Sequence, residues 1–390
     1  MRLALWTPRP HAAWVEAVLS VLRREADAVI VDAEPGTRPP CDLDLYHVAD
    51  DPAHAFVFRA LRERPGLVLL ADWSLRRLVR AATGDAALYV AEARRSRGDT
   101  GVFIARQELA GLGGEALPEL LVLNERVLDA SLGLVAFTGP VRARAAGRLP
   151  GRPVVHLPLS FLGEPGALPD RDSARVALGV PDASPLLALI SAPGEGPGRA
   201  LAAVEASEPG LLVRSWPDDD AGALRLLAAA DVAVALESPP GRGPAAPVVR
   251  AVAAGLPTLV SAGTVAAEEL PDGVAVHVSP GASEAAQLEA LLRRLVRDAR
   301  LRGRVGALAR AHAAQRQDPT PVAARLLDLA RLLAPSARAA RDALDATRAG
   351  ETTPLGWARG EVRWAAGELG VAALPSSVER LLVALLRAPR

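Results

Sequence analysis

Short apolar runs, each followed by a longer stretch with helical periodicity, recur through most of this 390-residue chain. Continuous apolar runs are typical of parallel strands buried on both faces, and the helical stretches between them predict βαβ units. The expected strands are Leu3–Trp6, Val29–Val31, Leu43–His47, Leu67–Leu70, Leu134–Phe137 and Val154–Leu157, followed by Leu186–Ser191, Leu211–Arg214, Val232–Leu236, Thr258–Ser261 and Val274–Val278.

The two series of strands predict an α/β protein with two Rossmann-like domains. The rhythm stops over Ser160–Asp172, which is rich in Gly and Pro and is the expected linker. We therefore expect an N-terminal domain over residues 1–160, a C-terminal domain over 173–333 and a helical tail over 334–390. The expected helices include Trp14–Arg24, Ala53–Arg62, Ala221–Ala229, Pro247–Ala254, Pro321–Leu333 and Ser336–Thr347.

The chain contains no lysine, so all 45 of its basic residues are arginines. This composition excludes Schiff-base chemistry, a Walker lysine and a lysine general base. A bound phosphate would have to be held by arginine, by backbone N–H groups or by a helix N-terminus. A formal net charge of zero gives no indication of a nucleic-acid partner.

The single cysteine, Cys41, excludes an internal disulfide and any multi-cysteine metal site. The apolar run at the N-terminus is too short for a signal peptide. No stretch approaches the roughly 20 apolar residues that a bilayer span requires. We expect a cytoplasmic protein, with peripheral contact at the inner face of the membrane left open.

Five segments, in this order, resemble the GT4-type retaining glycosyltransferases of bacteria. These segments are Tyr46–Phe58 with its Tyr-His pair, Arg64–Asp72, Leu123–Ser131, Leu226–Val234 and Arg250–Val260. The resemblance covers roughly residues 40 to 300. It implies the GT-B fold, in which two Rossmann-like domains with parallel sheets face each other.

The resemblance also implies a function. A nucleotide-sugar donor would give its sugar, with retention of configuration, to a glycan or lipid-linked acceptor such as a cell-envelope or polysaccharide sugar. Neither a cofactor nor an obligatory metal is expected. Membrane contact and a protein partner are left open.

The donor site is expected where a helix beginning near Pro247 points its positive N-terminus at the interdomain cleft. Several arginines around this cleft would suit a diphosphate, because a guanidinium binds phosphate oxygens in pairs. The expected donor-binding residues are Glu195, Arg199, Arg242, Gly243 and Arg250, and the expected acceptor-side residues are His47, Asp50, His54 and Asp72.

The chain departs from the family pattern at several of these places. No carboxylate lies within Arg242–Pro244, where the family has one, and Glu237 would substitute only if its loop folded back. Ala71 stands where the family has a histidine, and Thr7–His11 has no glycine. Asp218–Asp220 is interpreted as a helix cap with solvated charge and not as a metal site.

These departures keep two alternatives open. One is a catalytically inactive member of the same fold that acts as a binding or regulatory partner of an active transferase. The other is a different enzyme on related domains, such as a sugar-nucleotide epimerase or a dinucleotide oxidoreductase. No Gly-x-Gly-x-x-Gly follows the first strand, which disfavours the oxidoreductase.

Overall fold

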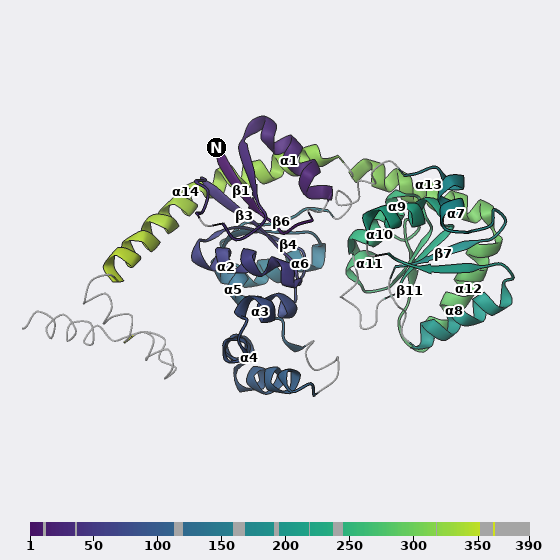
Figure 1. Cartoon of the computed structure of the whole chain (residues 1–390), viewed down its shortest axis with the longest axis horizontal. Helices are drawn as coiled ribbons and strands as arrows, with labels where there is room; N and C mark the ends of the chain where they lie inside the picture. The colour runs from purple at the N-terminus through teal and green to yellow at the C-terminus, as the bar shows by residue number, and fades with distance from the viewer. Residues whose placement is uncertain are drawn as a thin grey trace, which may run out of the picture.

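The computed structural model describes residues 1–10, 13–35, 37–112, 120–158, 168–190, 195–217, 219–236, 245–316, 318–351 and 362. Within these ranges the chain forms two parallel sheets, each covered by helices on both faces (Figure 1). The first sheet has the order β2-β1-β3-β4-β5-β6 and the second has the order β11-β10-β9-β7-β8. Two Rossmann-like domains are therefore present, as the sequence predicted.

The strands lie where the continuous apolar runs placed them. Because helices cover both faces of each sheet, the inner strands are buried along almost their whole length, without alternation of polar residues, whereas the strands at the sheet edges are partly exposed. The strands are β1 Arg2–Trp6, β2 Asp27–Val31, β3 Leu43–Val48, β4 Gly66–Leu70, β5 Ser131–Ala136, β6 Val154–His156, β7 Leu186–Leu189, β8 Leu212–Ser215, β9 Val232–Ala235, β10 Thr258–Ser261 and β11 Val276–Val278.

Helices lie between most successive strands, in the expected βαβ manner, and further helices follow the last strand. Those of the first part are α1 Ala13–Glu25, the short 3₁₀ helix η1 Pro52–His54, α2 Ala55–Glu63, α3 Arg76–Thr83, α4 Ala86–Leu109, α5 Glu125–Ala130 and α6 Gly139–Arg148. Those that follow are α7 Arg171–Ala177, α8 Glu195–Ser207, α9 Asp220–Ala229, α10 Ala245–Ala253, α11 Val265–Glu269, α12 Glu284–Arg297, α13 Ala299–Arg316 and α14 Pro319–Glu351.

Local sequence explains where α9 begins and where α10 ends. Asp219 caps α9, because its side chain accepts a hydrogen bond of 2.7 Å from the backbone N–H of Gly222. This confirms the cap predicted for the aspartate run. Gly255 follows α10 with φ of 78°, a left-handed conformation that turns the chain into β10 at little cost for glycine.

The two faces of the first sheet are covered by different parts of the chain. One face packs on a core that includes Tyr46 and Phe58, with side chains from α2 to α6. The other packs on a core that includes Leu3 and Leu19, with side chains from α1 and α14. Helix α14 therefore belongs structurally to the first sheet, although it lies at the far end of the chain (Figure 1).

Helix α14 differs from the prediction in two ways. It is one continuous helix across Pro335, whereas the sequence suggested separate helices before and after this proline. Leu333 and Ala337 are both buried against the first sheet, and this packing holds the helix together across a residue that lacks an N–H donor. The predicted domain boundary after residue 333 falls inside this helix.

A pair of hydrogen bonds anchors the later part of α14 to the loop before β3. Arg341 donates to the backbone carbonyls of Cys41 and Asp42. Cys41 itself is buried, and burial together with the nearby Asp44 carboxylate raises the pKa of its thiol to about 12. The thiol is therefore an inert core group at neutral pH. None of the helices in the described ranges is both long and apolar enough to cross a membrane.

Candidate functional site

The strand order of each sheet defines a position where a ligand can bind. In the first sheet the order reverses between β1 and β3, and in the second sheet it reverses between β7 and β9. Loops that leave the carboxyl ends of such strand pairs diverge in opposite directions and leave a crevice. These two switch points are therefore the places where the expected site residues should lie.

Two expected acceptor-side residues, His47 and His54, lie at the first switch point. Thr7, directly after β1, places its hydroxyl 3.0 Å from Nδ1 of His47 in β3. Nδ1 of His54 lies 2.8 Å from the backbone carbonyl of His47, and the two rings meet edge to face with centroids 4.7 Å apart. Trp14 and Phe137 contact the His47 ring from other sides.

The two histidines are buried, with 9% and 6% of their surfaces exposed. Burial, together with the neighbouring His54, lowers the pKa of His47 to about 3. Burial also lowers the pKa of His54, although the His47 carbonyl opposes this effect. Both rings are therefore neutral at physiological pH and act as hydrogen-bonding groups at the base of the switch point.

Asp50 and Asp72 follow the adjacent strands β3 and β4 and lie together. The backbone N–H of Asp50 donates to Oδ2 of Asp72 at 2.8 Å, and the Asp50 side chain accepts from the N–H of Leu78 at 3.0 Å. Surrounding protein atoms raise the pKa of both carboxyls, and the Asp50 carboxylate adds to the effect at Asp72. Asp72 as a residue is nonetheless exposed at this edge.

The expected donor-site helices bracket the second switch point. Helix α8 follows β7 and carries an exposed Arg199, and α10 follows β9 and carries Arg250. Glu195 begins α8, but its side chain is not among those described, and Arg242 and Gly243 lie outside the described residues. The structure thus places Arg199 and Arg250 on the two elements that diverge from the crevice.

Arg250 is not a free cation in this structure. Its Nη1 donates to Oδ1 of Asp220 at 2.7 Å, and its side chain is 16% exposed. Nε of Arg250 is buried and has no hydrogen-bond partner among the described residues. Sequence reasoning missed this ion pair, because Asp220 was interpreted only as part of a solvated cap.

Glu269 is a residue that sequence reasoning did not single out. The backbone N–H of Gly139, at the start of α6, donates to Oε1 of Glu269 at 2.7 Å, and Nε2 of His156 lies 3.1 Å from Oε2. Burial disfavours the carboxylate, but His156 and the N–H of Gly139 together hold the pKa of Glu269 below its usual value. Gly139 follows β5, His156 ends β6 and Glu269 follows β10, so this contact joins the carboxyl edges of the two sheets.

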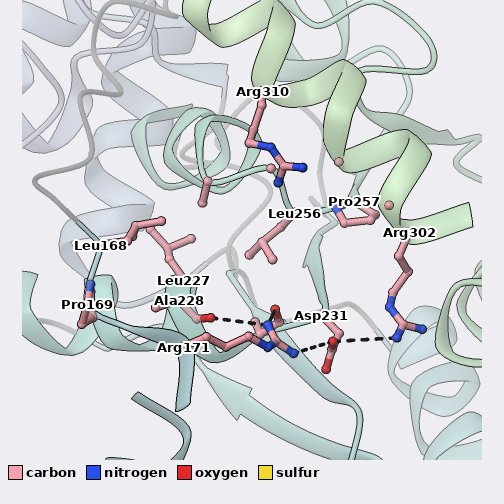
Figure 2. Close-up of a pocket in the computed structure, with 15 residues that line it drawn as sticks. Leu168, Pro169, Arg171, Leu227, Ala228, Asp231, Leu256, Pro257, Arg302 and Arg310 are labelled. Atoms are coloured by element: carbon pink, nitrogen blue, oxygen red, sulfur yellow. Dashed lines mark hydrogen bonds and ion pairs between the residues drawn. The ribbon is translucent and has the colours of Figure 1, made fainter. Parts of the chain in front are cut away.

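A separate cavity of about 340 Å³ lies at the opposite edge of the second sheet (Figure 2). Two of its arginines donate to carbonyls at helix C-termini: Arg171 donates to the Ala230 carbonyl at 2.9 Å, and Arg302 donates to the Leu295 carbonyl at 2.7 Å. Arg171 also pairs with Asp231 at 2.7 Å. Because this cavity is at the amino ends of β9 and β10, it is not the nucleotide crevice.

In the described part of the chain, no group of three or more His, Cys, Asp or Glu side chains is arranged to hold a metal ion.

No protein-family model matches the chain, and no curated protein matches it in sequence. Solved structures do match the fold. Sucrose-phosphate synthase from Thermosynechococcus elongatus is 15% identical with a TM-score of 0.52, and the match covers 85% of this chain and 99% of that one. Anabaena HepE, in complex with UDP-glucose, is 14% identical with a TM-score of 0.52, and the match covers 84% of this chain and 99% of that one.

These matches show that the fold is GT-B, as the sequence resemblance implied. The structural neighbours are glycosyltransferases, and a likeness at this level of identity is a statement about the fold.

Proposed function

We propose that this protein is a glycosyltransferase that moves a sugar from a nucleotide-sugar donor to a glycan or lipid-linked acceptor. The observation that carries the proposal is the position of α8 and α10, which diverge from the β7–β9 switch point. Open α/β sheets bind nucleotides at this position. The complex of the structural neighbour HepE with UDP-glucose supports this class of donor.

The roles of individual residues follow from their position. The N-terminal ends of α8 and α10 would face the diphosphate, where helix N–H groups and the helix dipole favour negative charge. Arg199 and Arg250 would supply the cations that a chain without lysine cannot supply otherwise. Arg250 reaches phosphate by exchanging its partner Asp220, whose side chain is 77% exposed and is readily solvated.

The acceptor would bind beside the first switch point. Asp72 is an exposed residue there, and a carboxylate can accept a hydrogen bond from an acceptor hydroxyl. His47 and Thr7 would shape the base of this crevice as neutral groups. Catalysis would then depend on positioning and on stabilisation of the leaving diphosphate, as in retaining GT4-type enzymes, without an obligatory metal or cofactor.

Calorimetric titration with UDP-, GDP- and ADP-sugars tests the donor site directly. We expect one donor to bind and to be hydrolysed slowly or transferred. Arg250→Ala should weaken its binding by about tenfold or more, since one charge-assisted contact to phosphate is lost. Arg304→Ala, an exposed arginine on α13, is the matched control and should leave donor affinity unchanged.

Two results would contradict the proposal. Absence of binding to every nucleotide sugar would exclude the transferase. Donor binding with neither hydrolysis nor transfer to any acceptor would instead favour a catalytically inactive member of this fold.

A further inference from the structure

The N-terminal domain contains a cavity that is separate from the switch point and has not been assigned a role above. Its volume is about 540 Å³, within the range of ligand pockets in proteins. Residues of α4, α5 and the end of α6 line it. These helices cover the face of the first sheet opposite α1 and α14 (Figure 1). Its lining residues are Trp73, Ser96, Arg97, Thr100, Val122, Asn124, Glu125 and Arg148.

A smaller hollow of about 230 Å³ adjoins this cavity, because Glu125 and Arg148 line both. We name the two adjoining hollows together the α5 groove, after the helix that contributes to both. One end of the groove is at Trp73, the residue that follows Asp72. A ligand in the groove would therefore extend toward the carboxyl edge of the first sheet, where the acceptor is expected.

Two arginines in the α5 groove lack partners, in contrast with their neighbours. Arg95 pairs with Asp129 at 2.5 Å, and Arg126 pairs with Glu92 at 2.9 Å. The side chains of Arg97 and Arg148 make no ion pair or hydrogen bond with any residue that the structure describes. Since Glu125 is the one acidic residue among the lining residues of the larger cavity, these two guanidinium groups leave its lining with a net positive charge.

The backbone around the α5 groove departs from regular geometry at two places. Helix α4 is interrupted at Arg97 and Gly98, where φ of Gly98 is 57° and ψ is −141°. Leu123 has φ of 53°, a left-handed conformation that is unusual for a residue with a side chain. Such strain persists where surrounding contacts hold it, and it is concentrated at functional sites.

Asn124 connects this strained segment to the aromatic end of the α5 groove. It is 1% exposed, and its Nδ2 donates to the backbone carbonyl of Trp73 at 2.9 Å. Leu75 donates its N–H to the carbonyl of Val122 at 2.7 Å. These bonds hold the chain that bears Trp73 against the start of α5. The Leu123–Ser131 segment, which the sequence resemblance singled out, therefore builds this wall of the groove.

The chemistry of the lining residues defines the class of ligand. An indole ring packs against the C–H face of a sugar, and Ser96, Thr100 and Glu125 offer groups that bond to hydroxyls. Glu125 already accepts a hydrogen bond of 2.8 Å from Ser96, which orients its carboxylate in the groove. Two unpartnered guanidinium groups bind a carboxylate or a phosphate.

We propose that the α5 groove binds an acidic saccharide, with a sugar ring on Trp73 and its carboxylate or phosphate group on Arg97 and Arg148. This inference rests on the proposed transferase function only in that the saccharide would be part of the acceptor. The groove itself is a binding site whether or not the donor site is active.

The test is a binding measurement without any donor. Intrinsic tryptophan fluorescence and calorimetry would follow titration of the full chain with oligogalacturonate, with mannose 6-phosphate and with the neutral maltotetraose. We expect at least one acidic ligand to bind more tightly than the neutral one. Oligogalacturonate alone would identify a carboxylate, and mannose 6-phosphate alone would identify a phosphate.

Arg97→Gln combined with Arg148→Gln should weaken acidic-ligand binding by about tenfold or more, because two charge-assisted contacts are lost. Arg94→Gln, on the same helix and outside the groove, is the control and should change nothing. All three positions are exposed, so these variants should fold, and thermal unfolding would verify it. Trp73→Leu should weaken acidic and neutral saccharides alike.

Equal binding of acidic and neutral ligands, or unchanged affinity in the double variant, would overturn the proposal. Failure of the α5 groove is distinguishable from failure of the transferase. Binding of a nucleotide sugar without binding of any acidic saccharide would refute only the proposal for the α5 groove. Binding of the saccharide without binding of any nucleotide sugar would refute only the proposed transferase function.

Discussion

The carboxylate of Glu269 accepts a hydrogen bond of 2.7 Å from the backbone N–H of Gly139, a residue 130 positions earlier in the chain. Gly139 follows Thr138, whose side chain caps α6. The carboxylate therefore lies at the positive end of a helix in the first domain, and His156 of the same domain lies beside it at 3.1 Å. One side chain of the second domain is thus bound by two groups of the first.

We expect Glu269→Gln to loosen this interdomain contact. The amide keeps the shape but loses the charge that favours the helix N-terminus and His156, and a charge-assisted hydrogen bond contributes about 1.5–3 kcal/mol. Small-angle X-ray scattering should show a larger radius of gyration for the variant. Glu268→Gln, an exposed neighbour, is the control and should leave the radius unchanged. Equal radii for all three proteins would refute this role.

The same carboxylate predicts a dependence of stability on pH. Because the folded-state pKa of Glu269 is below its unfolded value, its contribution is present above the unfolded pKa near 4.5 and is lost as pH falls through the folded pKa. Urea unfolding of the native chain and of Glu269→Gln at pH 7 and pH 3.5 would measure it. The difference in free energy of unfolding should shrink at the lower pH; a constant difference would contradict the assignment.

The lowered pKa of His47 predicts a further loss of stability at mildly acidic pH. This folded-state pKa of about 3 lies below the ordinary value of 6.5, so the unfolded chain binds more protons between these values. Stability should therefore fall as pH decreases through this window, by up to about 1.4 kcal/mol per pH unit. His47→Gln should reduce the slope of unfolding free energy between pH 7 and pH 5. His54→Gln would report the separate share of that histidine.

The packing of helix α14 on the first sheet predicts that this helix stabilises the first domain. Leu326 is 2% exposed and packs in the same core as Leu3 and Leu45. Leu326→Ala should lower the free energy of unfolding by about 2–5 kcal/mol and increase hydrogen exchange in β1 and β3. Leu332→Ala, at a position 63% exposed on the same helix, should have little effect. Increased exchange confined to the second sheet would contradict this placement.

The ion pair between Arg250 and Asp220 predicts a small energetic coupling. Asp220 is 77% exposed, so a double-mutant cycle of Arg250→Ala and Asp220→Ala should give about 0.2–1 kcal/mol. Asp220→Asn should keep or improve nucleotide-sugar affinity, because it releases Arg250 toward the phosphates. A loss of affinity in Asp220→Asn would mean that Asp220 orients Arg250 and does not compete for it.

Much of the fold could be predicted from local sequence. Continuous apolar runs identified the strands, since burial on both faces leaves no polar alternation. The Asp219 cap and the Gly255 turn could also be predicted, because each depends on the backbone within a few residues. His47 and Asp72 could be placed at strand ends, and strand ends of a parallel sheet share one edge. Their roles in binding stay predictions.

Other features were decided only by the tertiary structure. Helix α14 continues through Pro335 because Leu333 and Ala337 are buried against the first sheet. No local sequence pattern indicates that the helix packs on this distant surface. The partners of Arg250 and of Glu269 are 30 and 130 residues away, and periodicity carries no information at that range. Sequence pattern by itself determined which segments are strands and helices. The tertiary structure decided which charged side chains pair, and it placed α14 against the first sheet. These contacts depend on which residues lie close in space, and sequence pattern does not report that.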